Sequence, residues 1–215
     1  MTLTTYKWSI EEWHELVDAG LLEGKPVEFL EGEIVEVSPE GIEHSYTNDS
    51  LVKYLRNLLD NLADVRESHP VTLDNSEPEP DVAVIRLPET IYRTHHPYPE
   101  DIYWLIEIAA ESTEPIGSKS LRDAGAFAPF GERRKGTSAK TSNRTLKTDL
   151  NQKKITYARN GIPEYWVIDL VNKKLIVHTQ LQDNNYTQVN EYTTGTISPL
   201  AFPNIAIALD KLLLY

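Results

Sequence analysis

The run that decides the fold is Ile102-Tyr103-Trp104-Leu105-Ile106-Glu107-Ile108-Ala109, which is apolar at almost every position. A second run of the same kind, Asp81-Val82-Ala83-Val84-Ile85, precedes it in the chain. Consecutive apolar side chains are typical of strands that are covered on both faces. The two runs therefore predict central strands of a sheet with helices on both sides.

The segments around these runs alternate in a recognisable order. Leucines at helical spacing predict a helix over about 44–62, and a weak strand signal follows over 65–73. Beyond the two central runs, a helix is expected over about 148–160, because Gly161 and Pro163 would end it there. A further buried strand is expected over 164–169. The resulting core order is helix, three strands, helix, strand.

Shorter elements extend this core at both ends. Ser9-Ile10-Glu11-Glu12 predicts a capping box at the start of a short helix, and residues 27–31 and 33–37 predict a hairpin that turns at Glu31-Gly32. Near the other end, 173–179 and 186–192 indicate an exposed hairpin, followed by an apolar segment over 205–214. The fold class predicted is α/β, a mixed sheet flanked by helices with an added hairpin at each end.

Composition limits the classes of protein to consider. The chain has 215 residues, with 21 Lys+Arg against 33 Asp+Glu and a net charge of −12. One domain over 1–215 is expected at this length. No apolar run suits a membrane span, and the absence of cysteine excludes thiolate zinc sites and fits a cytoplasmic protein. The acidic balance disfavours non-specific binding to polyanions.

One segment, 114–145, differs from the rest of the chain. It is rich in Ser, Thr and Gly, has few apolar residues, and carries a charge of +4. More than 30 residues separate the strand over 102–109 from the next helix, whereas connections of about 2–6 residues are usual. We therefore expect 114–145 to be a flexible insertion.

Two carboxylates stand where charge is unfavourable. An unpaired, ionised Glu107 within a buried strand would cost several kcal/mol, so either a cation must meet it or its pKa must rise. Asp81 opens the other central strand. If the two strands are antiparallel, Asp81 and Glu107 converge at one edge of the sheet. Two such oxygen donors suit Mg²⁺.

A lysine is the natural third member of this site. At about 100° per residue, Lys153 and Lys154 lie on opposite sides of the apolar stripe of the following helix, with Lys154 slightly nearer to it. Either lysine could reach the sheet edge, where it could orient a metal-bound water or offset charge on a phosphate. The pattern alone leaves both open.

Taken together, these motifs resemble a known superfamily. Pro80-Asp81, Glu107 and a lysine on the next helix are similar to the PD-(D/E)xK nucleases. More narrowly, the chain resembles the Uma family of putative restriction endonucleases over about residues 8–212, apart from the insertion. The motifs that carry this resemblance are Val27-Glu28-Phe29-Leu30-Glu31-Gly32-Glu33-Ile34-Val35-Glu36-Val37-Ser38-Pro39, Glu43-His44, Glu79-Pro80-Asp81-Val82, Ile106-Glu107-Ile108, Asp149-x3-Lys153-x3-Tyr157-Ala158-Arg159-x-Gly161 and Glu164-Tyr165-Trp166-Val167-Ile168-Asp169.

The resemblance implies a restriction-endonuclease-like αβββαβ core and hydrolysis of DNA phosphodiester bonds. It assigns Asp81 and Glu107 as ligands of Mg²⁺ or Mn²⁺, joined by a backbone carbonyl next to Glu107. It ranks Lys153 ahead of Lys154 as the catalytic lysine and places Glu28 and His44 near the site. By kinship with nucleases that cut both strands, it also suggests a homodimer.

Plainer interpretations of the same residues remain open at this point. Glu107 could form a structural ion pair with a buried lysine, Asp81 could be a turn residue, and His44 could bond the backbone at a helix end. The alternative function is a catalytically inactive nuclease-fold protein that binds partners, and a metal-dependent hydrolase of another substrate is a further alternative. No GxGxxG, P-loop or HExxH motif occurs, which removes dinucleotide, Walker-type and zincin chemistry.

Overall fold

A mixed sheet of six strands forms the centre of the computed structural model, which describes residues 3–37, 39–110 and 149–214. The strand order is β3-β4-β5-β6-β7-β8, and only the β5–β6 pair is parallel. The strands are β3 (Asp64–Glu67), β4 (Val82–Ile85), β5 (Ile102–Ala109), β6 (Tyr165–Asp169), β7 (Lys174–Gln182) and β8 (Asn185–Tyr192). The predicted α/β class with a mixed sheet is confirmed.

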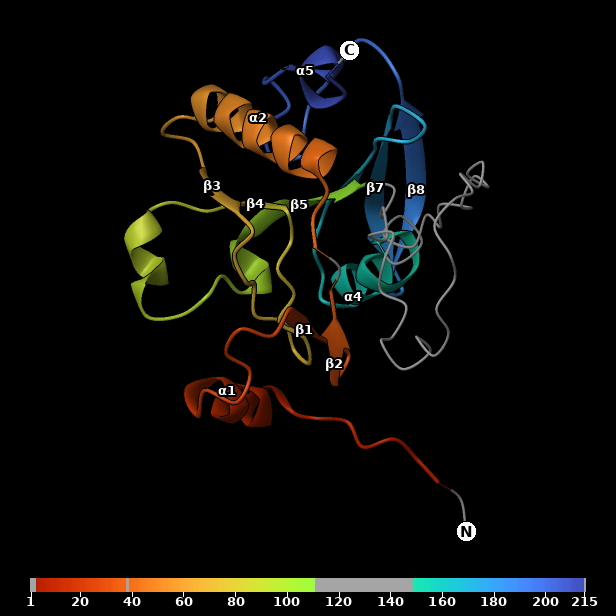
Figure 1. Cartoon of the computed structure of the whole chain (residues 1–215). Helices are drawn as coiled ribbons and strands as arrows, with labels where there is room; N and C mark the ends of the chain where they lie inside the picture. Colours follow the sequence, from red (N-terminus) through yellow and green to blue (C-terminus); the bar gives the residue numbers. More distant parts are fainter. Residues whose placement is uncertain (1–2, 38, 111–148, 215) are drawn as a thin grey trace, which may run out of the picture.

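Both faces of the sheet are covered, as the unbroken apolar runs predict. Helix α2 (Ile42–Leu58) and helix α5 (Leu209–Leu212) pack on the face that carries Val84, Trp104 and Trp166. Tyr157 of helix α4 (Lys154–Arg159) packs on the opposite face, together with Ala83, Leu105 and Val167. The two helices α2 and α4 therefore lie on opposite sides of the sheet (Figure 1).

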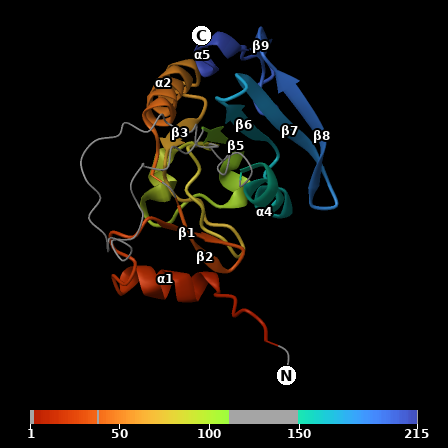
Figure 2. The ribbon, with the colours of Figure 1, turned by 45° about the vertical axis from the view of Figure 1, so that its right-hand side comes forward.

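The N-terminal elements lie below the central sheet in the view of Figure 2. Helix α1 (Ile10–Asp18) begins with the predicted capping box, in which Ser9 and Glu12 each bond the other's backbone N–H. Strands β1 (Val27–Leu30) and β2 (Glu33–Glu36) form a separate antiparallel hairpin. Its turn places Glu31 at φ 51° and Gly32 at φ 74°, a left-handed pair that matches the twist of a tight hairpin.

The C-terminal hairpin differs from its prediction. Strand β7 was expected to be exposed, but it pairs with β6 and buries Leu175, Ile176 and Val177, so the hairpin extends the central sheet. The apolar C-terminal segment forms β10 (Ile207–Ala208), which pairs with β9 (Thr196–Ile197), and then α5. Leu209 and Leu212 of α5 are buried in the core that contains α2.

Two other segments also differ from expectation. The weak strand expected over 65–73 ends at Glu67, and the 3-10 helices η1 (Glu89–Arg93) and η2 (Pro99–Asp101) separate β4 from β5. The single helix expected over 148–160 is a π-helix, η3 (Asp149–Lys153), followed by α4. The insertion expected over 114–145 lies outside the described residues. Within the described part of the chain, no helix is long and apolar enough to cross a membrane.

Candidate active site

Asp81 and Glu107 come from neighbouring strands. Strand β4 is antiparallel to β5 with Val82 opposite Ile106, so position 81 lies opposite position 107. The Asp81 carboxylate accepts the backbone N–H of Ile108 at Oδ2 over 2.6 Å. Both acids are buried, with 9% of Asp81 and 3% of Glu107 exposed. The structure therefore brings the two predicted acids together where β4 begins.

The backbone of Ile108 adds a second polar group at this place. Leu105 and Ala109 direct their backbone hydrogen bonds toward the β6 side, to Glu164 and from Leu170. Successive residues of a strand present their backbone groups to alternate sides. Ile108 therefore directs both its N–H and its C=O toward the β4 side, where the Asp81 carboxylate lies. This carbonyl is the one next to Glu107 that the family resemblance implied.

Glu107 accepts hydrogen bonds from two side chains of the continuous helical segment formed by η3 and α4, which we call the lysine helix. Lys153 Nζ donates to Glu107 Oε2 over 2.9 Å, and Tyr157 Oη donates to Oε1 over 2.7 Å. Lys153 and Tyr157 are four positions apart, which is the spacing that places side chains on the same helix face. Both are buried. The bond from the Tyr157 hydroxyl to Glu107 was not predicted from the sequence.

Glu28 brings a third buried carboxylate from strand β1. Its Oε2 lies 3.6 Å from Lys153 Nζ, so Lys153 lies between Glu28 and Glu107. The same Oε2 is buried and accepts no hydrogen bond among the described residues. A buried carboxylate oxygen without a hydrogen-bond donor is costly, so a further cation contact at Glu28 would be favourable.

His44 approaches Asp81 from the first turn of α2. Its Nε2 lies 3.1 Å from Asp81 Oδ2, and its Nδ1 lies 3.5 Å from Oε2 of Glu40. Glu40, His44 and Asp81 each offer one ligand atom within 4.8 Å of the others, and within the described ranges they form the one such group of three. Glu40 was missed, although its position four residues before His44 was a signal.

The structure shows which of the two candidate lysines, Lys153 and Lys154, faces the acids. Lys153 is buried against the acids, whereas Lys154 is half-buried and forms none of the ion pairs found among the described residues. Lys154 lies close to His178 of β7: burial lowers the pKa of His178 to about 4, and the positive charge of Lys154 contributes to that shift. Lys154 therefore faces a different part of the molecule.

The charges at the site do not balance. Glu28, Asp81 and Glu107 are buried carboxylates, whereas Lys153 is the single buried lysine or arginine among the described residues. At the rim, partial desolvation raises the pKa of Glu79, and the negative charge of Glu28 raises it further. Negative charge in excess of the nearby amine is the arrangement that a divalent cation would neutralise.

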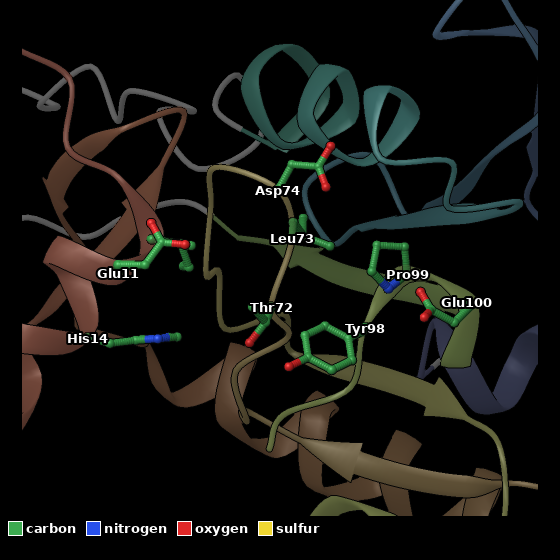
Figure 3. A pocket seen from close by; sticks show the side chains of 9 residues that line it. Glu11, His14, Thr72, Leu73, Asp74, Tyr98, Pro99 and Glu100 are labelled. Carbon is green, nitrogen blue, oxygen red and sulfur yellow. The ribbon is translucent and has the colours of Figure 1, made fainter. Parts of the chain in front are cut away.

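A pocket of about 620 Å³ opens beside α1, and none of these acids lines it. Beneath it, burial would raise the pKa of Glu77, but hydrogen bonds from His14, Thr72 and Trp13 outweigh burial and lower it. Figure 3 shows the side chains that line the pocket, which are those of Ile10, Glu11, His14, Thr72, Leu73, Asp74, Tyr98, Pro99 and Glu100. The carboxylate site and this pocket are therefore separate.

A six-stranded mixed sheet, two acids on adjacent strands and a lysine on the helix that follows define a nuclease-like α/β protein. The family model described as "Putative restriction endonuclease" matches residues 10–119 and 141–210. The chain therefore belongs to the Uma2 family, and the predicted family is confirmed. Both matched segments contain site residues.

The fold is shared with solved structures. One of them is the crystal structure of a putative nuclease from Anabaena variabilis, with a TM-score of 0.60 and 16% sequence identity. The alignment covers 92% of this chain and 97% of the other. At this identity the likeness concerns the fold. The search of curated proteins found no match.

Proposed function

We propose that the protein is a metal-dependent endonuclease that hydrolyses phosphodiester bonds in DNA. The observation that carries this proposal is the excess of buried negative charge: Glu28, Asp81 and Glu107 are buried at the site, and the one buried lysine there, Lys153, contacts Glu28 and Glu107. A purely structural ion pair would combine one carboxylate with one amine, whereas this site has more buried carboxylates than amines. The additional acids destabilise the fold unless a cation joins them, and a divalent metal ion supplies the missing charge.

The residues present fit such an ion. Asp81, Glu107 and the carbonyl of Ile108 would hold it, because carboxylate and carbonyl oxygens are the donors that Mg²⁺ and Mn²⁺ prefer. Each Glu107 oxygen already accepts a hydrogen bond, but a carboxylate oxygen has a further lone pair available. Glu28 Oε2, buried without a donor, supports a cation nearby. His44 and Glu40 offer nitrogen and oxygen donors on the other side of Asp81.

Each residue of the site has a task in this proposal. A bound metal ion would supply Lewis acidity and an activated water. Lys153, as the ammonium beside Glu107, orients the attacking water and offsets negative charge that develops on the phosphate. Tyr157 and Glu28 hold Glu107 and Lys153 in place, and His44 holds Asp81. Lys154 is the weaker candidate for the lysine role because it lies away from the acids.

DNA is proposed as the substrate from the family, which is described as restriction endonucleases. The net charge of −12 opposes a broad electrostatic attachment to DNA, so we expect few phosphate contacts and a shallow dependence of affinity on salt. By analogy with two-fold nucleases that cut both strands, we propose a homodimer.

The direct test is cleavage of DNA with Mg²⁺ or Mn²⁺, comparing the wild type with Glu107→Gln. We expect the variant to lose at least about 100-fold in rate, because it loses a ligand charge and the partner of Lys153. Glu36→Gln, an exposed acid of strand β2, serves as the matched control and should cleave at the wild-type rate. Equal rates for wild type and Glu107→Gln would refute the assignment.

A second measurement separates the active enzyme from an inactive binding protein on the same fold. Calorimetric titration with Mn²⁺ should show binding to the wild type and little to Asp81→Asn. Absence of both metal binding and cleavage in the wild type would favour the inactive protein. Metal binding without cleavage of any DNA would favour a metal-dependent hydrolase of a different substrate.

A further inference from the structure

Glu31 has an unusual backbone conformation for its residue type. It lies at the turn between β1 and β2, with φ of 51°. Gly, Asn and Asp adopt left-handed backbone conformations more readily than other residues do. For any other residue type this conformation costs roughly 1 kcal/mol. A glutamate at this position therefore needs a compensating gain from its side chain.

The Glu31 side chain makes that gain by contacts with the lysine helix. Its Oε1 accepts Thr156 Oγ1 over 2.8 Å, and its Oε2 accepts Arg159 Nη1 over 3.0 Å. Thr156 is fully buried. The β1–β2 hairpin is itself fixed, because Ser76 Oγ lies 2.8 Å from Glu31 N and Phe29 O accepts the N–H of Glu77. Glu31 thus joins a fixed hairpin to helix α4.

Helix α4 depends on such contacts for its position. It has six residues and follows a π-helix of five residues. Helices this short are not stable without contacts to the rest of the fold. The segment from Lys153 to Arg159 is held to Glu107 through Lys153 and Tyr157, and to Glu31 through Thr156 and Arg159. The hairpin that carries Glu31 also carries Glu28, the second carboxylate that faces Lys153.

We propose that Glu31 is a positioning residue for Lys153: it clamps α4 to the β1–β2 hairpin and so sets the place of the Lys153 ammonium between Glu28 and Glu107. This inference rests on the proposed function for its catalytic consequence. The positional effect itself is a property of the folded chain, and it holds whether or not DNA is cleaved.

The first test measures how accessible the Lys153 amine is to a chemical reagent, in the absence of metal and DNA. Lysines are acetylated with a brief pulse of an amine-reactive ester, and modification at each position is read by mass spectrometry. In Glu31→Gln, which loses the negative charge facing Arg159 and one of the two acceptor oxygens, we expect Lys153 modification to rise several-fold over wild type. The neighbouring Lys154 should be modified at the wild-type rate, which distinguishes local release of Lys153 from general unfolding.

Matched variants make the result decisive. Glu33→Gln, on the same hairpin, removes an exposed ion pair with Lys7 and should leave Lys153 protected. Arg159→Gln breaks only one of the two clamp contacts, does not endanger the fold because Arg159 is exposed, and should raise Lys153 modification by a smaller factor. Wild-type protection of Lys153 in both Glu31→Gln and Arg159→Gln would overturn the proposal.

The second test applies to the active enzyme. Glu31→Gln should lower kcat on DNA by about tenfold or more and leave KM within about twofold, because misplacing a positioned group affects the reacting state more than substrate binding. An unchanged kcat together with released Lys153 would overturn the catalytic consequence. If the wild type does not cleave DNA, the proposed function fails while the acetylation result still decides the position of Lys153.

Discussion

The imidazole of His44 and the carboxylate of Asp81 lie 3.1 Å apart, from Nε2 to Oδ2, although helix α2 and strand β4 supply them separately. The same oxygen of Asp81 also accepts the backbone N–H of Ile108. Asp81 is thus oriented from the helix side and from the sheet side before any ligand arrives. A carboxylate fixed in this way binds a cation with little loss of side-chain entropy.

Divalent cations should raise the stability of the wild type and not that of Asp81→Asn. An ion that binds only the folded chain stabilises it by about 2.7 kcal/mol at a concentration 100 times its Kd. The measurement is the thermal midpoint with increasing Mn²⁺, followed by excess chelator to reverse the shift. Glu36→Gln should respond as the wild type does, and an equal shift in Asp81→Asn would place the ion elsewhere.

Loss of the Lys153 charge should make the fold dependent on metal. Lys153→Met leaves Glu28, Asp81 and Glu107 buried without an amine, and breaking a buried ion pair costs about 3–5 kcal/mol. We expect urea denaturation at neutral pH to show this loss, and millimolar Mg²⁺ to recover part of it. Lys154→Met, the adjacent control, should change stability by less than about 1 kcal/mol. Similar losses in the two variants would contradict the burial difference between these lysines.

His44 should influence which metal binds. An imidazole donor favours Mn²⁺ over Mg²⁺ relative to a purely oxygen site. If His44 binds the ion or orients Asp81, His44→Asn should weaken Mn²⁺ binding by about 10–100-fold and narrow the difference between Mn²⁺ and Mg²⁺. Titration calorimetry with each ion measures both effects. Glu40→Gln should have a smaller effect because Glu40 is about half exposed, and unchanged Mn²⁺ binding in His44→Asn would exclude His44 from the site.

Stability should fall in mild acid because of His178. Burial lowers its pKa in the folded chain from 6.5 to about 4, so the unfolded chain takes up a proton in this range and the folded chain does not. The free energy of unfolding should therefore decrease by about 3 kcal/mol on this account as the pH falls from 6.5 to about 4. His178→Phe keeps a ring beside Tyr165 and Tyr186 and removes the proton site.

The difference between the wild type and His178→Phe isolates this contribution from the carboxyl groups that titrate in the same range. Urea denaturation of both proteins at several pH values gives that difference. The difference in the free energy of unfolding should be constant above pH 7. Below pH 6.5 the wild type should lose stability relative to His178→Phe. A difference that does not vary with pH would show that folding does not lower the pKa of His178.

The strands and the meeting of two acids followed from the sequence for a simple reason. Short runs of consecutive apolar residues are typical of strands covered on both faces, and Asp81 opens one run while Glu107 interrupts the other. Antiparallel pairing then places position 81 opposite position 107. The burial of β7 was not predictable in the same way, because its pattern fits either an exposed hairpin or the next strand of the sheet.

The choice between Lys153 and Lys154 could not be derived from helical spacing. That analysis assumed a continuous α-helix, but Asp149–Lys153 is a π-helix, whose wider turn changes the direction of every residue that follows. The rotation places Lys153 against Glu107 and directs Lys154 toward His178. The side-chain contacts of Glu31 and Tyr157 were not predicted because their partners lie far away in the sequence. Local sequence patterns do not indicate contacts between such distant positions.

The parallel pairing of β5 with β6 requires the chain to cross from one end of the sheet to the other between them, and the lysine helix lies on this crossover. Glu107 belongs to the hydrogen-bonded ladder and Asp81 immediately precedes β4, while the amine that faces Glu107 is carried by a connecting segment. Under the proposed function, the acids that would hold the cation belong to the central sheet and its edge, whereas the amine that would act on the phosphate belongs to the connector. The sequence of the connector can therefore change in evolution while the strands next to the acids stay the same.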